Sequence, residues 1–310
     1  MSAADFTLTA LDGRALAATA YSPAGPPRAA AVVLNATGVP RRYYRRFAGW
    51  LSSQGVAVIT FDYRGVADSA LADPRTDDAQ MLDWARLDAS AAIDEALARW
   101  PEAPLWVVGH SFGGQALGLT PRARDLSGAI IVSAGVGDMS EFPTGFRLRF
   151  ELPLRVFMPL ATRALGYYPG WLGLAEDMPS GVVLQWRRWC LTRDYVRGAL
   201  GPGETHYDRL ELPLVHYEIT DDDWAPRPAA YRLRSWFERA TVAVRRVRPA
   251  DIGQARIGHF GFFRAGATEA LWREVLGYLL GERPIVAAPA DGPDAPEDQP
   301  AFAFAATETR

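Results

Sequence analysis

The fold of this chain is decided by the stretch Leu105–Gly114, which reads LWVVGHSFGG. A short apolar run ends at a glycine, a serine stands in the turn, and two glycines follow. The pattern G-x-S-x-G is typical of a nucleophile elbow, in which a buried strand turns sharply into a helix. Gly109 and Gly113 lack Cβ atoms, so they allow the strained turn and the close approach of strand and helix. We therefore expect Ser111 at the apex of this turn, as a nucleophile.

The same turn is expected to stabilise negative charge. The first N–H groups of the new helix point at the place where an oxyanion would form, so Phe112 is the first expected donor. The second donor should come from the loop 35–40 that follows the apolar run ending at Leu34. Gly38 permits a backbone twist that turns a following N–H inward. Val39 is therefore the expected second donor, with Gly38 as the alternative.

Composition limits the classes of protein to which the chain can belong. It has 310 residues, 49% of them hydrophobic, enough for one large α/β domain with an inserted subdomain. With a net charge of −3, the chain lacks the basic character that is typical of nucleic-acid-binding proteins. No apolar stretch reaches the roughly 18 uncharged residues of a membrane-spanning helix. The first residues lack the basic start and apolar run of a signal peptide.

Cysteine and lysine usage narrow the chemistry. Cys190 is the single cysteine, which excludes an intrachain disulfide and fits a reducing cytoplasm. We expect it to be a buried, inert thiol, and the surrounding segment 186–190 to be core rather than a cofactor box. The sequence contains no lysine, which excludes Schiff-base catalysis, a Ser–Lys dyad and a Walker-type phosphate loop. No cofactor is expected.

Apolar runs alternate with amphipathic stretches along most of the chain. Strands are expected over 16–21, 30–34, 56–61, 105–108, 129–132, 214–219 and 240–247, and helices over 47–54, 78–100 and 267–280. Strands alternating with helices predict a mostly parallel central sheet covered by helices on both faces.

The alternation stops near Asp138. Residues 139–209 are rich in aromatic, proline and arginine residues and show no clear strand, so we interpret them as an inserted helical cap. Residues 1–138 and 210–284 would then form the core domain. The segment 285–310 is rich in Ala, Pro and Asp and is expected to be disordered.

A serine hydroxyl needs a neighbouring base to take its proton. Four histidines are available. His110 follows directly in the elbow and cannot easily turn back onto Ser111, His206 lies in or just after the cap, and His216 is in a strand. Only His259 follows the last expected strand and precedes a helix, so it is the expected base.

The acid that orients His259 should follow the strand ending at Ile219. Asp221, Asp222 and Asp223 stand there, and consecutive residues that leave a strand point in different directions. Asp222 is favoured because the acid often lies a few residues before a proline, here Pro226. The other two would face solvent or cap local N–H groups. A metal site is not expected, because no histidine or further carboxylate has ligand spacing.

The run 41–46, RRYYRR, follows the oxyanion loop and should lie near the pocket mouth. It either binds an anionic substrate group or is a solvated helix start whose tyrosines pack inward, the interpretation that we favour. Tyr43, Tyr44 and His110 are the expected substrate-binding residues.

With these residues in place, the chain resembles the α/β-hydrolase superfamily over about residues 5–282. The matching pieces are Phe61–Gly65, Gly109–Gly114, Asp221–Asp222 with Ala225–Pro226, and Gly258–Arg264, and they are similar to a bacterial group of mostly uncharacterised serine hydrolases. The resemblance implies the α/β-hydrolase fold, a cap and a Ser111–Asp222–His259 triad, but no defined substrate.

Two departures from that pattern stand out. The His-Gly pair common in the oxyanion loop is Thr37-Gly38, and Ala67 replaces a glycine in the stretch 64–69, RGVADS. The first leaves the identity of the second oxyanion donor open. The second predicts a loop of different shape.

These features favour a cofactor-independent serine hydrolase that forms an acyl-enzyme from a small-molecule ester, thioester or related acyl compound. The aromatic-rich cap predicts a lipophilic or aromatic substrate. A peptidase is disfavoured, because the cap has no acidic cluster to hold an amino terminus. Acyl transfer through the same triad and a non-catalytic binding role on this scaffold are the alternatives. The sequence does not define the oligomeric state.

Overall fold

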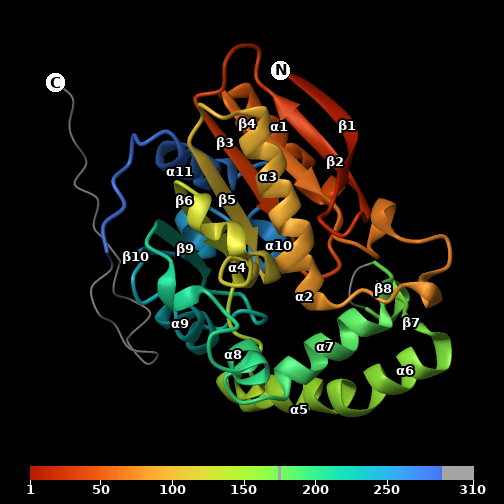
Figure 1. Cartoon of the computed structure of the whole chain (residues 1–310). Coiled ribbons are helices and arrows are strands. Elements are labelled where there is room, and N and C mark those ends of the chain that lie inside the picture. The colour runs from red at the N-terminus through yellow and green to blue at the C-terminus, as the bar shows by residue number, and fades with distance from the viewer. Residues whose placement is uncertain (174–175, 288–310) are drawn as a thin grey trace.

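A computed structural model describes residues 1–173 and 176–287. Eight strands form the central sheet, in the order β1-β2-β4-β3-β5-β6-β9-β10 (Figure 1). Their bounds are β1 Ser2–Thr9, β2 Ala15–Ser22, β3 Ala29–Leu34, β4 Val56–Phe61, β5 Leu105–His110, β6 Gly128–Val132, β9 Pro213–Ile219 and β10 Thr241–Val247. β2 is antiparallel to β1 and β4, and the remaining neighbours are parallel. The expected α/β fold with a mostly parallel sheet is confirmed.

The middle strands are buried throughout because helices cover both faces of the sheet. Every residue of β3, β4, β5 and β6 is buried. Alternate residues point to opposite faces, so Val107 belongs to one hydrophobic cluster and Val108 to the other. This explains why these strands are continuous apolar runs in the sequence.

Two sets of helices form the outer layers. α1 (Arg45–Ser53) and α11 (Glu269–Leu279) pack on one face, and α3 (Ala89–Arg99), α4 (Phe112–Ala116) and α9 (Arg227–Ser235) on the other. Figure 1 shows α3 in front of the sheet and α11 behind it. The expected helix 78–100 is divided into a short α2 (Met81–Asp83), a π-helical turn (Trp84–Asp88) and α3.

Two elements lie outside the sequence predictions. β1 is an edge strand whose outer residues are exposed, with Leu8 its only buried residue, so the sequence carries little strand signal there. α9 buries only a narrow side of an arginine-rich segment, through Ala229, Ala230, Leu233 and Arg234.

The segment between β6 and β9 lies beyond the carboxyl ends of the parallel strands (Figure 1). It contains α5 (Thr144–Leu152), a π-helical turn (Pro153–Phe157), α6 (Met158–Leu165), α7 (Ser180–Cys190) and α8 (Tyr195–Leu200). It is not wholly helical, since β7 (Tyr167–Tyr168) pairs with β8 (Met178–Pro179), a ladder too short to leave a sequence pattern. We call the described part of 139–209 the cap.

Two expectations concern the chain end and the membrane. Residues 285–287 contain no helix or strand, and the rest of the expected disordered tail lies outside the described residues. None of the helices in the described part of the chain has the length and apolar character needed to cross a membrane.

Candidate active site

The turn after β5 has the strained geometry of a nucleophile elbow. Ser111 adopts φ 53° and ψ −113°, a conformation that costs a non-glycine residue free energy, and α4 begins at the next residue. A Cβ on Gly109 would lie 2.5 Å from the carbonyl oxygen of Gly113, and one on Gly113 would lie 2.0 Å from that of Leu34. Both glycines are therefore required by close backbone approach.

Ser111, His259 and Asp222 form one hydrogen-bonded row. His259 Nε2 lies 2.9 Å from Ser111 Oγ, and His259 Nδ1 lies 2.8 Å from one oxygen of Asp222 and 3.0 Å from the other. An ionised carboxylate only accepts hydrogen bonds, so Nδ1 carries the proton and Nε2 is free to accept from the serine hydroxyl. Asp222 is buried and also accepts from the N–H groups of Trp224 and Ala225, at 2.9 and 3.2 Å.

The two neighbouring aspartates are placed differently. Asp221 accepts from the N–H groups of Ile257 and Gly258, both at 3.0 Å, and so holds the turn that carries His259. Asp223 is exposed to solvent. Of the three carboxylates, Asp222 is the one that contacts His259.

The oxyanion loop differs from the expectation. Val39 N–H already donates to Ala36 O at 3.1 Å, so the expectation that Val39 supplies the second donor is wrong. Gly38 has φ 67° and does not line the cavity beside Ser111. Thr37 does line it, and no described residue accepts a hydrogen bond from its N–H. The first donor fits the expectation in position, because Phe112 is the first residue of α4 and lacks an intrahelical acceptor.

Tyr44 and His110 are not substrate-binding residues, contrary to the prediction, because both are fully buried behind the elbow. His110 Nε2 lies 2.8 Å from His259 O, which can only accept, so Nε2 carries the proton. Nδ1 therefore accepts from Tyr44 Oη at 2.9 Å, and Tyr44 Oη accepts from Ala36 N–H at 2.9 Å. Burial and the nearby His259 hold the pKa of His110 well below its usual value. The row links the oxyanion loop to the backbone of His259.

Tyr43 is also absent from the cavity lining. Its hydroxyl donates to the carbonyl oxygen of Phe260, and its ring packs edge-on against those of Tyr44 and Phe260. The prediction that Tyr43 binds substrate is therefore wrong in this structure. The sequence did contain the correct alternative, a helix start whose tyrosines pack inward.

A cavity of about 600 Å³ opens above Ser111, between the sheet and the cap. Its lining is mainly apolar and includes the following side chains of the cap: Met139, Phe142, Phe146, Phe150, Leu154, Met158, Tyr168, Leu172 and Trp186. The sequence assigned none of them to the site individually, although the aromatic composition of the cap indicated such a lining.

A second hollow of about 740 Å³ lies on the other side of Trp224. Phe146, Phe150 and Trp224 line both spaces, and their rings pack together with centroids 4.2 to 5.6 Å apart. These three rings form a wall between the two spaces. Trp224 also lies beside His259, at a centroid distance of 6.3 Å.

Metal-ligating side chains and the thiol of Cys190 are the remaining groups of chemical interest. Within residues 1–173 and 176–287, no group of three or more His, Cys, Asp or Glu side chains is arranged to hold a metal ion. Cys190 is buried at the cavity wall, where burial raises the pKa of its thiol.

Comparisons with known proteins bear on the fold of the chain. The family model described as serine aminopeptidase, S33, matches residues 25–170, which include Ser111 but neither Asp222 nor His259. No curated protein matches the chain.

Three solved structures are similar to most of the chain. A soluble variant of monoglyceride lipase from Saccharomyces cerevisiae aligns over 88% of this chain and 94% of its own, with a TM-score of 0.63 and 14% identity. Est1E from Butyrivibrio proteoclasticus, bound to ferulic acid, aligns over 89% and 98%, with a TM-score of 0.56 and 14% identity. Monoacylglycerol lipase from Paleococcus ferrophilus aligns over 86% and 99%, with a TM-score of 0.55 and 15% identity. Together with the strand order and the elbow, these likenesses show that the chain has the α/β-hydrolase fold.

Proposed function

We propose that the chain is a cofactor-independent serine hydrolase that acts on an ester, thioester or related acyl compound. The observation that carries this proposal is the continuous hydrogen-bonded row from Ser111 through His259 to Asp222 at the base of an apolar cavity. The base His259 lies within hydrogen-bond reach of both the nucleophile and the orienting acid, as acyl transfer requires.

The row supports a two-step reaction. Ser111 Oγ attacks the acyl carbonyl while His259 Nε2 takes the hydroxyl proton, and Asp222 stabilises the resulting imidazolium. The tetrahedral intermediate collapses to the acyl-enzyme as His259 returns the proton to the leaving alcohol or thiol. A water molecule then loses a proton to His259 and attacks the acyl carbon, which releases the acid and restores Ser111.

We assign the oxyanion hole to the N–H groups of Phe112 and Thr37. Phe112 N–H is free because it begins α4, and Thr37 faces the cavity. Ala36 N–H is engaged by Tyr44 and Val39 N–H by the turn, so neither competes. Loss of one such donor typically costs about a hundred- to a thousandfold in rate.

The lining favours a lipophilic or aromatic acyl group. Aromatic and aliphatic side chains of α5, α6 and α7 face Ser111 across the cavity, and Arg149 is the only Asp, Glu or Arg among the described lining residues. A peptide amino terminus would find no carboxylate there. The proposal therefore departs from the aminopeptidase activity in the name of the matching family model.

Domain boundaries and a cellular location complete the proposal. We propose residues 1–138 and 210–284 as the catalytic core and 139–209 as its cap, because the cap elements contribute the apolar side of the cavity. A cytoplasmic location fits the single cysteine, Cys190.

The proposal is tested with a fluorophosphonate probe, peptide mass spectrometry and a series of nitrophenyl esters of increasing chain length. We expect an adduct on Ser111, none in the Ser111→Ala variant, and turnover that rises with chain length until the cavity is full. Labelling without hydrolysis, but with product formed when an alcohol is added, would replace hydrolysis by acyl transfer. Folded protein that neither labels nor turns over would support a binding role instead.

A further inference from the structure

The cap segment from α5 to α6, Thr144–Leu165, has two apolar faces. The inner face consists of residues spaced by four that line the cavity, namely Phe146, Phe150, Leu154 and Met158. A second series with the same spacing is shifted by two residues, namely Leu148, Leu152, Val156 and Leu160. Two residues of a helix correspond to about 200°, so the second series lies on the opposite face. We call it the outer stripe.

The outer stripe is exposed to solvent. The exposed fraction is 74% for Leu148, 57% for Leu152 and 58% for Leu160, and Phe157 beside them is exposed as well. A helix that covers a core needs only one apolar face, and the inner face already fills that role. Contiguous exposed apolar side chains of this kind mark an interaction surface.

Another exposed apolar side chain of the cap stands next to residues that line the cavity. Trp171 is 77% exposed, and the next two residues, Leu172 and Gly173, line the cavity. Tryptophan is favoured where an apolar phase meets water, because its ring is amphipathic. The cap therefore exposes apolar side chains both on the outer stripe and beside the cavity rim.

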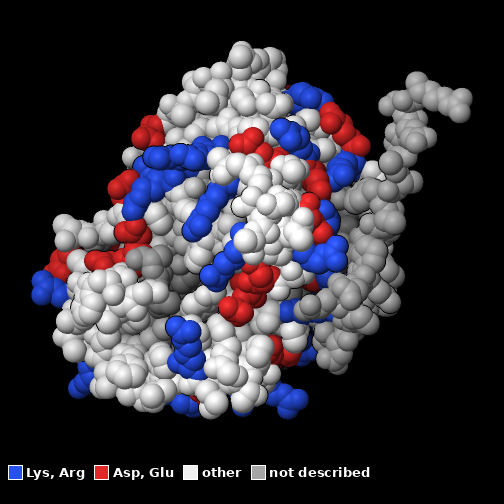
Figure 2. Space-filling model, turned by 180° about the vertical axis from the view of Figure 1, so that it is seen from behind, with Lys and Arg blue, Asp and Glu red and all other residues white. Residues whose placement is uncertain are grey.

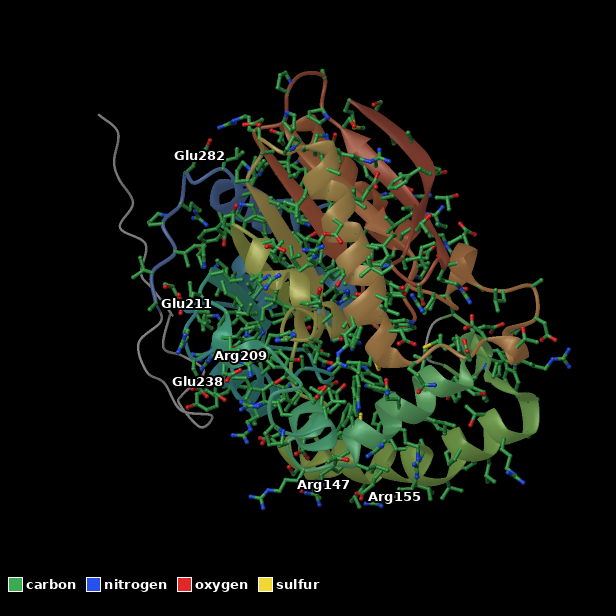
Figure 3. All side chains as sticks on the ribbon, in the orientation of Figure 1. Arg147, Arg155, Arg209, Glu211, Glu238 and Glu282 are labelled. Atoms are coloured by element: carbon green, nitrogen blue, oxygen red, sulfur yellow. The ribbon has the colours of Figure 1, made fainter. Side chains whose placement is uncertain are left out.

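The charges around the outer stripe are basic. Residues 144–165 contain four arginines, Arg147, Arg149, Arg155 and Arg163, against the single acidic residue Glu151, a net charge of +3 in a chain of net charge −3. Of these, Arg149 also lines the cavity, and Arg155 pairs with Glu151 at 2.7 Å. Arg147 and Arg155 project away from the sheet at the outer side of the cap (Figure 3). In the space-filling view the lobe below the central hollow is mostly uncharged, with basic side chains along its lower edge (Figure 2).

We propose that the outer stripe docks this protein on the surface of a lipid bilayer that carries anionic headgroups. Leucine, phenylalanine and tryptophan side chains next to arginines are the composition with which a helix lies in the membrane interface. Anionic lipids attract such arginines over about a Debye length, so the negative charge of the rest of the chain is screened. A second copy of this chain is a poorer partner, since its outer stripe would bring the same arginines into contact.

Docking here would place the cavity rim at the source of a lipophilic substrate. This benefit depends on the proposed hydrolase function, whereas binding itself requires no turnover. The experiment therefore uses the full chain as the Ser111→Ala variant, and activity is measured separately. Binding without activity would overturn only the proposed function, and activity without binding would overturn only the docking proposal.

The measurement is co-sedimentation with phosphatidylcholine vesicles, with and without about 30% phosphatidylglycerol. We expect binding to the anionic vesicles and a decrease at about 0.5 M salt. Leu148→Glu combined with Leu160→Glu should lower the partition coefficient about tenfold. The matched control is Leu11→Glu, a leucine with 72% exposure in the turn between β1 and β2, outside the cap.

The double variant should keep full activity on a short, water-soluble nitrophenyl ester, because neither leucine lines the cavity. The proposal is overturned if the chain sediments with neither kind of vesicle, or if Leu11→Glu lowers binding as much as the double variant does. It is also overturned if the outer-stripe variant instead abolishes a dimer detected by analytical ultracentrifugation, which would assign the stripe to a second copy.

Discussion

The two sides of the cavity are built in different ways. The floor, formed by Tyr44, His110, Ser111, Asp222 and His259, is held by directional hydrogen bonds of 2.8 to 3.0 Å between buried or half-buried groups. The roof, formed by side chains of α5, α6 and α7, consists mainly of aromatic and aliphatic groups whose attraction is non-directional. Hydrogen bonds fix the positions of atoms to a few tenths of an ångström, whereas apolar contacts constrain only the size and shape of the group that fits. On the proposed function, the floor therefore specifies the reaction and the roof the class of substrate.

The largest effect should come from removing the reacting groups of the floor. Ser111→Ala and His259→Ala should each lower kcat by a factor on the order of 10⁴ or more, with the fold intact. Ester turnover and circular dichroism measure the two properties. A Ser111→Ala variant with activity within tenfold of the unmodified chain would contradict the assignment.

Substitution of the three consecutive aspartates should identify the one that orients His259. Asp222→Asn should lower kcat by a factor on the order of 10⁴, because the amide favours the wrong tautomer of His259. Asp223→Asn is the matched control and should be nearly neutral, since Asp223 is exposed. Asp221→Asn should fall between them, because it weakens the turn that carries His259. A dead Asp223→Asn with an active Asp222→Asn would reverse the assignment.

Acid should destabilise the sheet that carries the floor. His216, in β9, is buried and its pKa is lowered to about 4, mainly by burial. The unfolded chain binds this proton first, so stability falls as pH drops from about 6.5 towards 4, by roughly 3 kcal/mol in total. In urea unfolding between pH 7 and pH 4.5, His216→Gln should lose less stability than the unmodified chain. Equal losses would show that His216 does not carry this pH dependence.

The row behind the elbow should have a smaller effect on rate. Tyr44→Phe leaves the buried Ala36 N–H without its acceptor and His110 without its donor. We expect about 1–3 kcal/mol lower stability and a loss in kcat of about tenfold with KM little changed. Tyr43→Phe is the matched control, because its hydroxyl bonds Phe260 O at the surface side of the same helix start. An equal loss of kcat in both variants would argue against a specific positioning role for Tyr44.

The smallest effect should come from the roof. Leu154→Trp fills part of the cavity and should lower kcat/KM for long-chain esters by about tenfold while sparing acetyl esters. Leu152→Trp, two residues away on the outer face, is the matched control. If Leu154→Trp lowers kcat/KM equally for long-chain and acetyl esters, the roof positions the reacting groups as well as selecting the acyl group.

Local sequence patterns were enough to predict most of the fold. The apolar runs of β3 to β6 predicted buried parallel strands, and those strands are confirmed within a residue or two at each end. The glycines around Ser111 predicted the elbow because a tight turn leaves no room for Cβ atoms, as the contacts at Gly109 and Gly113 show. Their positions after expected strands pointed to Asp222 and His259, whose catalytic roles stay a prediction.

The sequence by itself therefore determined seven of the eight strands of the sheet, the elbow and the candidates for the triad, since periodicity and glycine placement act through neighbours along the chain. Only the tertiary structure decided that Thr37 rather than Val39 presents a free N–H, and that Tyr44 and His110 support the site from behind. It alone also showed that the cap helices carry a second, exposed apolar face. Each of these depends on which donor already has an acceptor and which side chain is covered, and residues distant in sequence provide both.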